Sequence, residues 1–374
     1  MGKDLQSKDI KNGNNKSKAA IFFSAGIGDA ILMVPLIREL QSCSYQVTIF
    51  LNSPFIDIEF LHFNKIPCDQ LIKTSLGFSM NTILSYFRKF DFVFLDYSSS
   101  SIVNISTGMF ISRKLFVHRK RKLLLPGIKF LFEKQETHAA ILNLQLFNHK
   151  FLEKDFKIDQ LKLVIKDAQK PDIILNLEKE SKIPIFVQPS AANLTAKYKN
   201  WPVEYWIELI SRLIKLFPDF IFILAGDKNE IEIGEKISRK IGKSCINLMG
   251  NTELTEASKL LFFSKIYLGL DSGFMHLAVA YGIPTFSVFG SSSYDLFGYE
   301  KFDPFKNRVI FNSLPCWPCS GYSKRNIKKV KNPKDCPDVE CLIKLKPDKV
   351  FDHFIWFYKE LVSIQNNATS SPIP

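Results

Sequence analysis

Short apolar runs alternate with segments of helical periodicity along most of the chain. Runs that are apolar at every position are typical of strands covered on both faces of a parallel sheet. The run at 266–270 is of this kind, and further largely apolar runs predict strands at 20–24, 46–51, 92–95, 184–188, 220–224 and 246–248. Helical spacing predicts helices at 29–41, 79–90, 202–217, 229–241, 253–263 and 274–281. This alternation predicts an α/β fold with two doubly wound parallel sheets.

The same pattern divides the chain into domains. Its 374 residues exceed the usual size of one domain, so two domains are expected. The polar segment around Pro171 separates the two βα halves, which predicts a linker there. The predicted parts are a disordered start at 1–18, a first domain at 19–170, a linker at 171–183, a second domain at 184–346, a helix at 347–362 and a flexible tail at 363–374.

The segment Lys265–Gly290 contains the clearest functional signal. Asp271, Ser272 and Gly273 follow an apolar strand and open a short helix, and His276 falls in the first turn of that helix. Helix N-termini bind anions because their first N–H groups have no intrahelical partner and the helix dipole is positive there. We therefore predict a phosphate site. The competing interpretation is that the Asp and Ser side chains only cap the helix and that the imidazole is a surface group.

A second corner, rich in glycine, lies at 24–30 between the first strand and the first helix. Glycines there allow a ligand to approach the backbone closely. The corner is not a dinucleotide fingerprint, because Ile31 stands where a third glycine is needed and the second strand ends at Asn52 instead of an acid. One carboxylate, Asp29, remains at the helix N-terminus. It either accepts a proton from a substrate hydroxyl as a general base or caps the helix.

The loop 188–201, QPSAANLTAKYKNW, follows a strand and leads into a helix opened by Pro202. The loop contains Thr195, Lys197 and Lys199, and it can place an ammonium beside a phosphate. An exposed lysine loop is the alternative. The sequence has no D-x-D motif, so it predicts no metal clamp for a diphosphate and no cofactor required for catalysis.

The net charge of +13 is concentrated in one segment. Between Arg113 and Lys134, eight Lys and Arg residues accompany one acid, Glu133, and large apolar residues lie between them. This mixture suits an anionic membrane surface or an anionic lipid. The alternative is a solvated basic face over ordinary core residues. Because no helix-turn-helix, zinc-finger or RNA-binding signature occurs, a nucleic-acid partner is not expected.

The start of the chain and its cysteines bear on the cellular compartment. The first eighteen residues lack the apolar core of a signal peptide, and Gly and Asp residues interrupt the apolar stretch at 21–37; a cytoplasmic protein is therefore expected. Four thiols in a C-x-x-C pair and a wider second pair predict a structural zinc site, with ordinary reduced thiols as the alternative. The predicted ligands are Cys316, Cys319, Cys336 and Cys341.

Five motifs follow one another along the chain. They are AGIGDAILMVPLIREL, QPSAANLTAKYKNWPVEYWIELI, FILAGDKNE, INLMGNTELTEASKLL and GLDSGFMHLAVAYGIPTFSVFG. In this order they resemble glycosyltransferase family nine, the lipopolysaccharide heptosyltransferases. The resemblance covers about residues 20–351. It implies the GT-B fold, with two Rossmann-like domains facing a cleft, an acceptor domain first and an ADP-heptose domain second.

The resemblance also implies a reaction and its residues. The reaction is an inverting, metal-independent transfer of a heptose from ADP-heptose to the inner core of lipopolysaccharide. Asp29 corresponds to the family's proposed general base, and Lys199, before the Trp-Pro pair, to its diphosphate contact. The implied donor-binding residues are Thr195, Lys199, Asp271, Ser272, Gly273 and His276. The basic residues assigned to the acceptor are Arg119, Lys120, Arg121 and Lys122.

The expected partners follow from this reaction. They are ADP-heptose, an anionic lipid-linked saccharide and, as a peripheral contact, the inner face of the plasma membrane. Three other functions remain open at this point. The chain could use another nucleotide sugar, bind a nucleotide sugar or lipid-linked saccharide without catalysis, or act as a nucleotide-sugar epimerase of the same fold.

Overall fold

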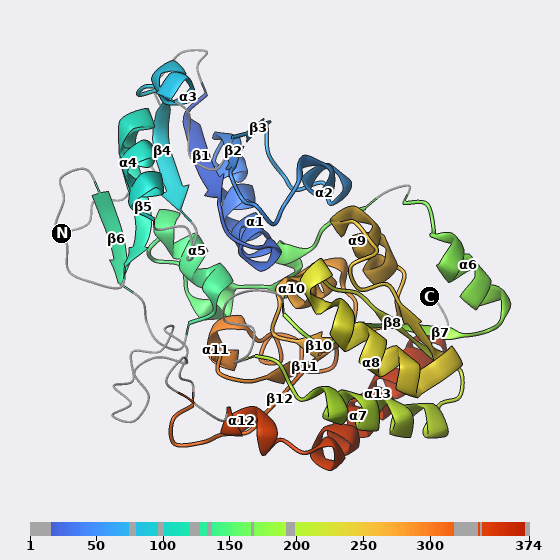
Figure 1. The fold of residues 1–374 in the computed structure, drawn as a ribbon. Coiled ribbons are helices and arrows are strands. Elements are labelled where there is room, and N and C mark those ends of the chain that lie inside the picture. The colour runs from blue at the N-terminus through green and yellow to red at the C-terminus, as the bar shows by residue number, and fades with distance from the viewer. Residues whose placement is uncertain are drawn as a thin grey trace. The chain divides into compact units, whose positions relative to one another are not determined.

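The computed structural model describes residues 16–74, 80–95, 101–119, 128–132, 137–165, 168–191, 199–317, 336 and 339–370. The chain divides into two compact units (Figure 1). Unit 1 comprises Met1–Ile58, Ile66–Lys134 and Ala139–Asp155, and unit 2 comprises Glu59–Lys65, Gln135–His138 and Phe156–Pro374. Each unit contains a six-stranded sheet whose strand pairs are parallel.

The sheet of unit 1 has the strand order β3-β2-β1-β4-β5-β6. The strands are β1 (Lys18–Phe23), β2 (Gln46–Leu51), β3 (Gln70–Lys73), β4 (Phe90–Leu95), β5 (Ser112–Arg119) and β6 (Ile128–Phe132). β1 pairs with both β2 and β4, so the direction of winding reverses between β1 and β4. Residues 19–23 of β1 are all buried, which explains why this run is apolar at every position.

Helices cover this sheet. α1 (Ile27–Ser42) contacts α5 (Ala139–Phe147), whereas α3 (Met80–Ser85) and α4 (Ile102–Ile111) pack onto the core cluster that contains Phe22 and Val93. A buried side-chain network joins β5, α5 and α1. His118 Nε2 lies 2.9 Å from Asn143 Oδ1, and Asn143 Nδ2 donates to the carbonyl of Leu32 at 3.0 Å. Burial lowers the pKa of His118 to about 4, so this imidazole is neutral at physiological pH.

The sheet of unit 2 has the order β12-β11-β10-β7-β8-β9. The strands are β7 (Ile183–Gln188), β8 (Phe220–Leu224), β9 (Cys245–Asn247), β10 (Ile266–Leu270), β11 (Thr285–Phe289) and β12 (Asn307–Phe311). β7 pairs with both β8 and β10, as β1 pairs with β2 and β4. The two sheets therefore share one winding, with a reversal beside the first strand of each.

Two long helices of unit 2 bury one face each, whereas α10 (Gly273–Tyr281) is buried on all sides. α7 (Val203–Leu216) buries Trp206, Leu209, Ile210 and Leu213 at helical spacing. α13 (Pro347–Ser370) adds Val350, Phe354, Phe357 and Leu361 to the same core cluster. The remaining α-helices are α2 (Ile58–Phe63), α6 (Asp172–Lys179), α8 (Ile231–Ile241), α9 (Leu254–Phe262), α11 (Tyr294–Phe297) and α12 (Glu340–Ile343). Among the residues described, none of the helices has both the length and the apolar character needed to cross a membrane.

The two doubly wound parallel sheets predicted from the sequence are confirmed, but several boundaries differ. The segment predicted as a linker, 171–183, contains α6, which buries Ile174 and Leu177 at i, i+3 spacing. The main segment of unit 2 begins earlier than predicted, at Phe156. The last helix continues to Ser370, so residues 363–370 are helical where a flexible tail was expected.

The structure of the basic segment 113–134 does not match a stretch whose apolar residues bind lipid. Its described parts form β5 and β6, two strands of the sheet of unit 1. Leu115, Phe116 and Val117 are buried in the core, as the alternative of a basic face over core residues requires. The apolar residues of β5 therefore stabilise the fold and are not available to a lipid.

Candidate functional site

The predicted phosphate corner lies where β7 and β10 end, at the reversal of winding in the second sheet. Ligands of doubly wound sheets bind outside the carboxyl ends of the strands at such a reversal. Asp271 and Ser272 follow β10, α10 begins at Gly273, and Gln188 ends the neighbouring β7. The fold thus brings the loop after β7 and the corner after β10 to one place.

Lys199 and Asp271 form an ion pair at this corner. Lys199 Nζ lies 2.8 Å from Asp271 Oδ2 and also donates to the Asp271 carbonyl at 3.2 Å. The Asp271 side chain is 4% exposed and the Lys199 side chain 19%. Each charge compensates the desolvation of the other. An ammonium is therefore held beside the amino end of α10, where the sequence predicts a phosphate.

The electrostatics of Asp271 favour its ionised form. Burial by itself would raise the pKa of this carboxyl. The nearby Lys199 ammonium, which also donates a hydrogen bond, outweighs burial, and the pKa lies below its ordinary value. Asp271 is therefore a fixed negative charge at neutral pH, suited to hold a cation and not to supply a proton.

His276 is buried beside the ion pair and is not the surface group of the competing interpretation. It is 4% exposed. Its Nδ1 lies 2.7 Å from the Tyr299 hydroxyl, and its Nε2 lies 4.0 Å from Asp271 Oδ1. Burial lowers the pKa of His276 to about 4, so the ring is neutral at physiological pH. Tyr299 fixes the ring orientation, and the sequence gives no local sign of this contact.

Ser272 occupies the N-cap position of α10, but its hydroxyl does not cap the helix. The hydroxyl donates to Gln188 Oε1 and lies 2.9 Å from the Tyr267 hydroxyl. Tyr267 in turn donates to the carbonyl of Leu270 at 2.8 Å. The capping interpretation is therefore wrong for the serine side chain. The first N–H groups of α10 keep their capacity to bind an anion.

The glycine corner of unit 1 lies at the equivalent place, between β1 and α1. The N–H of Gly26 donates to Asp29 Oδ2 at 3.2 Å, and Asp29 is half-buried. The Asp29 carboxylate caps α1, which confirms one of its two interpretations. Its role as a general base stays a prediction.

Two asparagines near this corner were not predicted as site residues. Asn104 Nδ2 donates to Ser24 Oγ at 2.9 Å, and Asn52 Nδ2 donates to Asn104 Oδ1 at 3.2 Å. Both asparagines are buried. They connect the carboxyl ends of β1 and β2 with the start of α4. Asn52 directly follows β2, a largely apolar strand, and this signal could have identified it, whereas Asn104 has no comparable local signal.

A sequence profile described as glycosyltransferase family 9 (heptosyltransferase) matches residues 105–330, more than half of the chain. This chain belongs to glycosyltransferase family 9. The resemblance seen in the five motifs is thereby confirmed, and the protein is a glycosyltransferase.

Similar proteins extend over nearly the whole transferase. Lipooligosaccharide heptosyltransferase 2 of Campylobacter jejuni is 22% identical over 347 residues, which cover 90% of this chain and 97% of the relative. The structure of E. coli ADP-heptose lipopolysaccharide heptosyltransferase II matches with a TM-score of 0.65 and 17% identity, covering 93% of this chain and 99% of that one. TibC, a dodecameric iron-containing heptosyltransferase in complex with ADP-D-β-D-heptose, matches with a TM-score of 0.56 and 12% identity, covering 92% and 77%. These structural matches show that the transferase shares the GT-B fold.

The transferase has a further buried carboxylate that was not predicted as a site residue. Glu230 follows β8, the neighbour of β7, and is 4% exposed. Its Oε1 accepts from Ser190 Oγ at 2.5 Å, and its Oε2 accepts from the N–H of Asp227 at 2.6 Å. Burial raises the pKa of Glu230. The local D-x-x-E capping pattern in FILAGDKNE was the available signal.

Some predicted residues of the transferase lie outside the described part of the chain. They are Thr195, Lys120, Arg121, Lys122 and Cys319. Arg119 ends β5, and only its backbone is described. Cys316 and Cys336 are half-buried, and Cys341 lies in the core of unit 2. Within the described ranges, no group of three or more His, Cys, Asp or Glu side chains could hold a metal ion. The zinc site stays a prediction, because one of its four ligands is not described.

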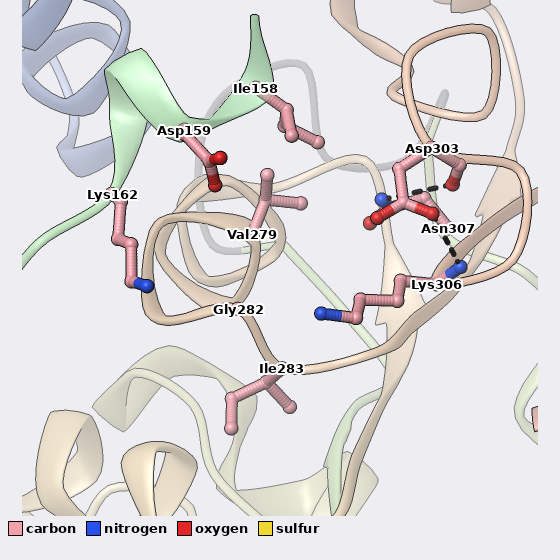
Figure 2. A pocket seen from close by; sticks show the side chains of 9 residues that line it. All are labelled: Ile158, Asp159, Lys162, Val279, Gly282, Ile283, Asp303, Lys306 and Asn307. Atoms are coloured by element: carbon pink, nitrogen blue, oxygen red, sulfur yellow. Dashed lines mark hydrogen bonds between the residues drawn. The ribbon is translucent and has the colours of Figure 1, made fainter. Parts of the chain in front are cut away.

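A pocket in unit 2 lies elsewhere (Figure 2). Its lining residues are Ile158, Asp159, Lys162, Val279, Gly282, Ile283, Asp303, Lys306 and Asn307. Gly282 and Ile283 precede β11, and Lys306 precedes β12. The pocket is therefore at the amino ends of these strands, whereas Asp271 follows the carboxyl end of β10. Because the predicted donor residues do not line it, this pocket does not mark the donor site.

Proposed function

We propose that this transferase moves a heptose from ADP-heptose to the inner core of lipopolysaccharide, with inversion at the anomeric carbon. The observation that carries the proposal is the buried cluster of Lys199, Asp271 and His276 at the amino end of α10, which suits a diphosphate. The name of the Campylobacter relative supports the sugar, and the complex of TibC with ADP-heptose supports the donor.

In this proposal, Lys199 and the first N–H groups of α10 bind the diphosphate of the donor. An ammonium carries three N–H donors, so it can bridge a carboxylate and a phosphate. Negative charge grows on the diphosphate as ADP leaves, and donors already fixed in position stabilise that charge without further reorganisation. Asp271 keeps the ammonium in place, and Tyr299 orients the neutral ring of His276 toward the same corner.

Asp29 is the proposed general base. It accepts the proton of an acceptor hydroxyl while the hydroxyl oxygen forms a bond to the anomeric carbon. The bond from that carbon to the diphosphate breaks, and its electron pair leaves with ADP. Attack on the face opposite the leaving group inverts the anomeric centre. The bond from the Gly26 N–H to Asp29 Oδ2 orients the carboxylate, and a positioned base of this kind contributes about 10²-fold to 10⁴-fold to the rate.

The proposal assigns the positive charge at the diphosphate to Lys199 and α10, and no catalytic metal is required. The iron in the name of TibC belongs to that protein. Zinc at Cys316, Cys319, Cys336 and Cys341 would stabilise the fold without taking part in the reaction. Metal removal can therefore separate two effects: an immediate loss of transfer and a slow loss of structure.

The proposed acceptor is an anionic, lipid-linked saccharide at the inner face of the plasma membrane, with the transferase in the cytoplasm. Arg119, Lys120, Arg121 and Lys122 follow one another at and beyond the end of β5. Four adjacent cations attract anionic groups, and salt weakens this attraction. We assign them to the acceptor.

The test is a transfer assay with purified transferase, ADP-heptose and the lipid-linked saccharide, read by mass spectrometry. We expect the acceptor to gain the mass of one heptose. The gain should persist during a brief exposure to EDTA. The Asp29→Asn variant serves as the inactive control. Donor consumption without growth of the acceptor would indicate an epimerase or a hydrolase instead. Donor binding with neither outcome would indicate a binding protein. Loss of transfer in EDTA that magnesium or manganese restores would contradict the metal-free mechanism.

A further inference from the structure

Helices α3 and α4 present apolar side chains to the outside of unit 1. Their inner residues, among them Ile83, Ile105 and Met109, pack onto the core of the sheet. Leu84 is 58% exposed, Phe87 53%, Val103 55% and Phe110 37%. We call Leu84, Phe87, Val103 and Phe110 the α3–α4 patch.

Helices α3 and α4 are neighbours (Figure 1). The rings of Phe87 and Phe110 are in contact, with centroids 4.6 Å apart. Phe87 lies in the turn that follows α3, and its N–H donates to the carbonyl of Leu84 at 3.2 Å. Val103 precedes Phe110 by seven residues within α4, which places these two side chains on one side of that helix. The patch is thus one surface and not a set of isolated apolar side chains.

Exposed apolar side chains elsewhere include Ile231 on α8 and Trp356 on α13, but charged residues make up most of the exposed face of α8. α8 exposes Glu232, Glu235, Lys236, Arg239 and Lys240, as expected for a helix that faces water. α4 is apolar on its inner face, and its exposed positions include Val103 and Phe110. Adjacent exposed aromatic and aliphatic side chains of this kind mark a surface that binds a protein or a membrane.

Basic side chains border the α3–α4 patch. The N–H of Arg88 bonds to the carbonyl of Phe110 at 3.3 Å, and Arg88 and Lys89 are exposed. Arg113 is 63% exposed and lies 3.5 Å from the nearby acid, Asp91. Cations around an apolar centre complement a surface that is anionic outside and apolar beneath, as an anionic bilayer is.

We propose that the α3–α4 patch docks this transferase on an anionic lipid bilayer. Leu84, Phe87, Val103 and Phe110 enter the boundary between headgroups and acyl chains, and the neighbouring cations contact the headgroups. The proposal rests on the proposed function for the reason to be at a membrane, because a lipid-linked acceptor is available only there. It assigns docking to residues other than Arg119–Lys122, which are assigned to the acceptor.

Vesicle flotation tests the proposal, with vesicles of phosphatidylcholine alone or mixed with phosphatidylglycerol. The parent protein should float with the mixed vesicles. Serine at the four patch positions (L84S, F87S, V103S and F110S together) should lower the partition coefficient at least about tenfold, since apolar surface no longer leaves water. The matched control is Leu216→Ser with Phe305→Ser, at positions 52% and 56% exposed in unit 2. This control should float like the parent.

A second measurement does not depend on the fourfold variant folding. Phe87→Trp adds one indole to the patch, and vesicles with brominated acyl chains quench indoles that enter the bilayer. Quenching should exceed that of the parent protein, whose native tryptophans supply the background. The K89Q/R113Q variant should bind the mixed vesicles more weakly than the parent at low salt and equally at high salt.

Transfer to a deacylated, water-soluble acceptor separates this proposal from the proposed function. The folded patch variant should transfer heptose to that acceptor at the parent rate, and more slowly to acceptor embedded in vesicles. If the parent lacks transfer on both acceptors but still floats through the patch, the proposed function fails and docking stands. Flotation of the folded patch variant like the parent would overturn the docking proposal. So would a parent protein that covers the patch by forming a dimer that the serine variant cannot form.

Discussion

The two glycine-bearing corners of this protein occupy the same place in two sheets of the same winding, yet their polar groups are arranged differently. After β10, the charge of Asp271 is buried and paired with Lys199. After β1, Asp29 is half-buried and accepts a backbone hydrogen bond from Gly26. A buried pair keeps a cation fixed for an anionic ligand, whereas a half-exposed carboxylate can meet the hydroxyl of a substrate. The same architecture thus holds a buried ion pair in one unit and a half-buried carboxylate in the other, in line with the binding and proton-transfer roles proposed for them.

The largest effect is expected from removing the buried anion. Asp271→Leu leaves Lys199 without its counter-charge, and loss of one partner of a buried pair costs about 3 kcal/mol. We expect the free energy of unfolding to fall by about that amount and ADP binding to be lost, measured by urea denaturation and calorimetry.

The matched double variant separates stability from binding. Asp271→Leu with Lys199→Met removes both charges, so it should recover most of the lost stability without recovering ADP binding. A double variant as unstable as Asp271→Leu would show that the carboxylate matters for reasons other than the ion pair.

The next largest effect concerns the other corner. Asp29→Asn keeps a side-chain oxygen that can accept the hydrogen bond from the Gly26 N–H, so stability and ADP affinity should change little. Turnover should fall about a hundredfold or more, as expected for loss of a positioned base. Steady-state kinetics measures the turnover, and calorimetry measures the stability and the ADP affinity. Near-parental turnover would leave Asp29 with the capping role alone.

A smaller effect separates phosphate contacts from nucleoside contacts. Lys199→Ala should weaken ADP binding about tenfold to a hundredfold, because a charge-assisted hydrogen bond is lost. His276→Ala should weaken it less, since the imidazole is neutral. Adenosine affinity should stay near that of the parent for both variants. An equal loss for ADP and adenosine, measured by calorimetry, would point to a disordered corner and not to lost phosphate contacts.

The smallest effect is a pH dependence that both units share. His118 in unit 1 and His276 in unit 2 have a pKa of about 4 in the folded protein, against about 6.5 when unfolded. Between these values the unfolded state binds more protons, so stability is greatest above pH 6.5 and falls as the pH drops toward 4. Each histidine contributes at most about 1.4 kcal/mol per pH unit.

Denaturation at several pH values measures this slope. His118→Gln and His276→Gln should each reduce the slope of the free energy of unfolding against pH by the contribution of that histidine. In NMR titrations of the parent protein, both imidazoles should remain neutral above pH 5.5. An imidazole that titrates near 6.5 in the folded parent would contradict its burial as a neutral group.

Much of the fold could be predicted because its signals are local. Fully apolar runs identified β7, β8 and β10, and the polar residues after β10 identified the corner. β5 was missed because Arg113 and Lys114 precede its short apolar run. The basic residues led to a prediction of a lipid-binding segment and not of a strand. α6 was missed because a polar segment near Pro171 concealed the spacing of Ile174 and Leu177.

The candidate site was predictable only as far as its residues share a motif. Asp271, Ser272 and His276 lie within one strand-to-helix turn. The partners that orient them come from elsewhere: Gln188 ends a different strand, and Tyr299 follows His276 by 23 residues. Burial keeps His276 neutral, and the Lys199 ammonium keeps Asp271 ionised despite its burial; both effects depend on the folded unit. Such contacts require the folded chain.

Trp201 links the donor corner to the order in which the chain is synthesised. It lies two residues after Lys199, its indole N–H donates to the carbonyl of Leu345 at 2.8 Å, and it shares a core cluster with Val350, Phe354 and Leu361. On the ribosome, residues 345–361 emerge after Lys199 and after the strands of unit 1. The loop that presents Lys199 must therefore wait for them, although the strands of unit 1 have left the exit tunnel long before. The nascent transferase should complete its donor-binding corner only after residue 361 has left the exit tunnel.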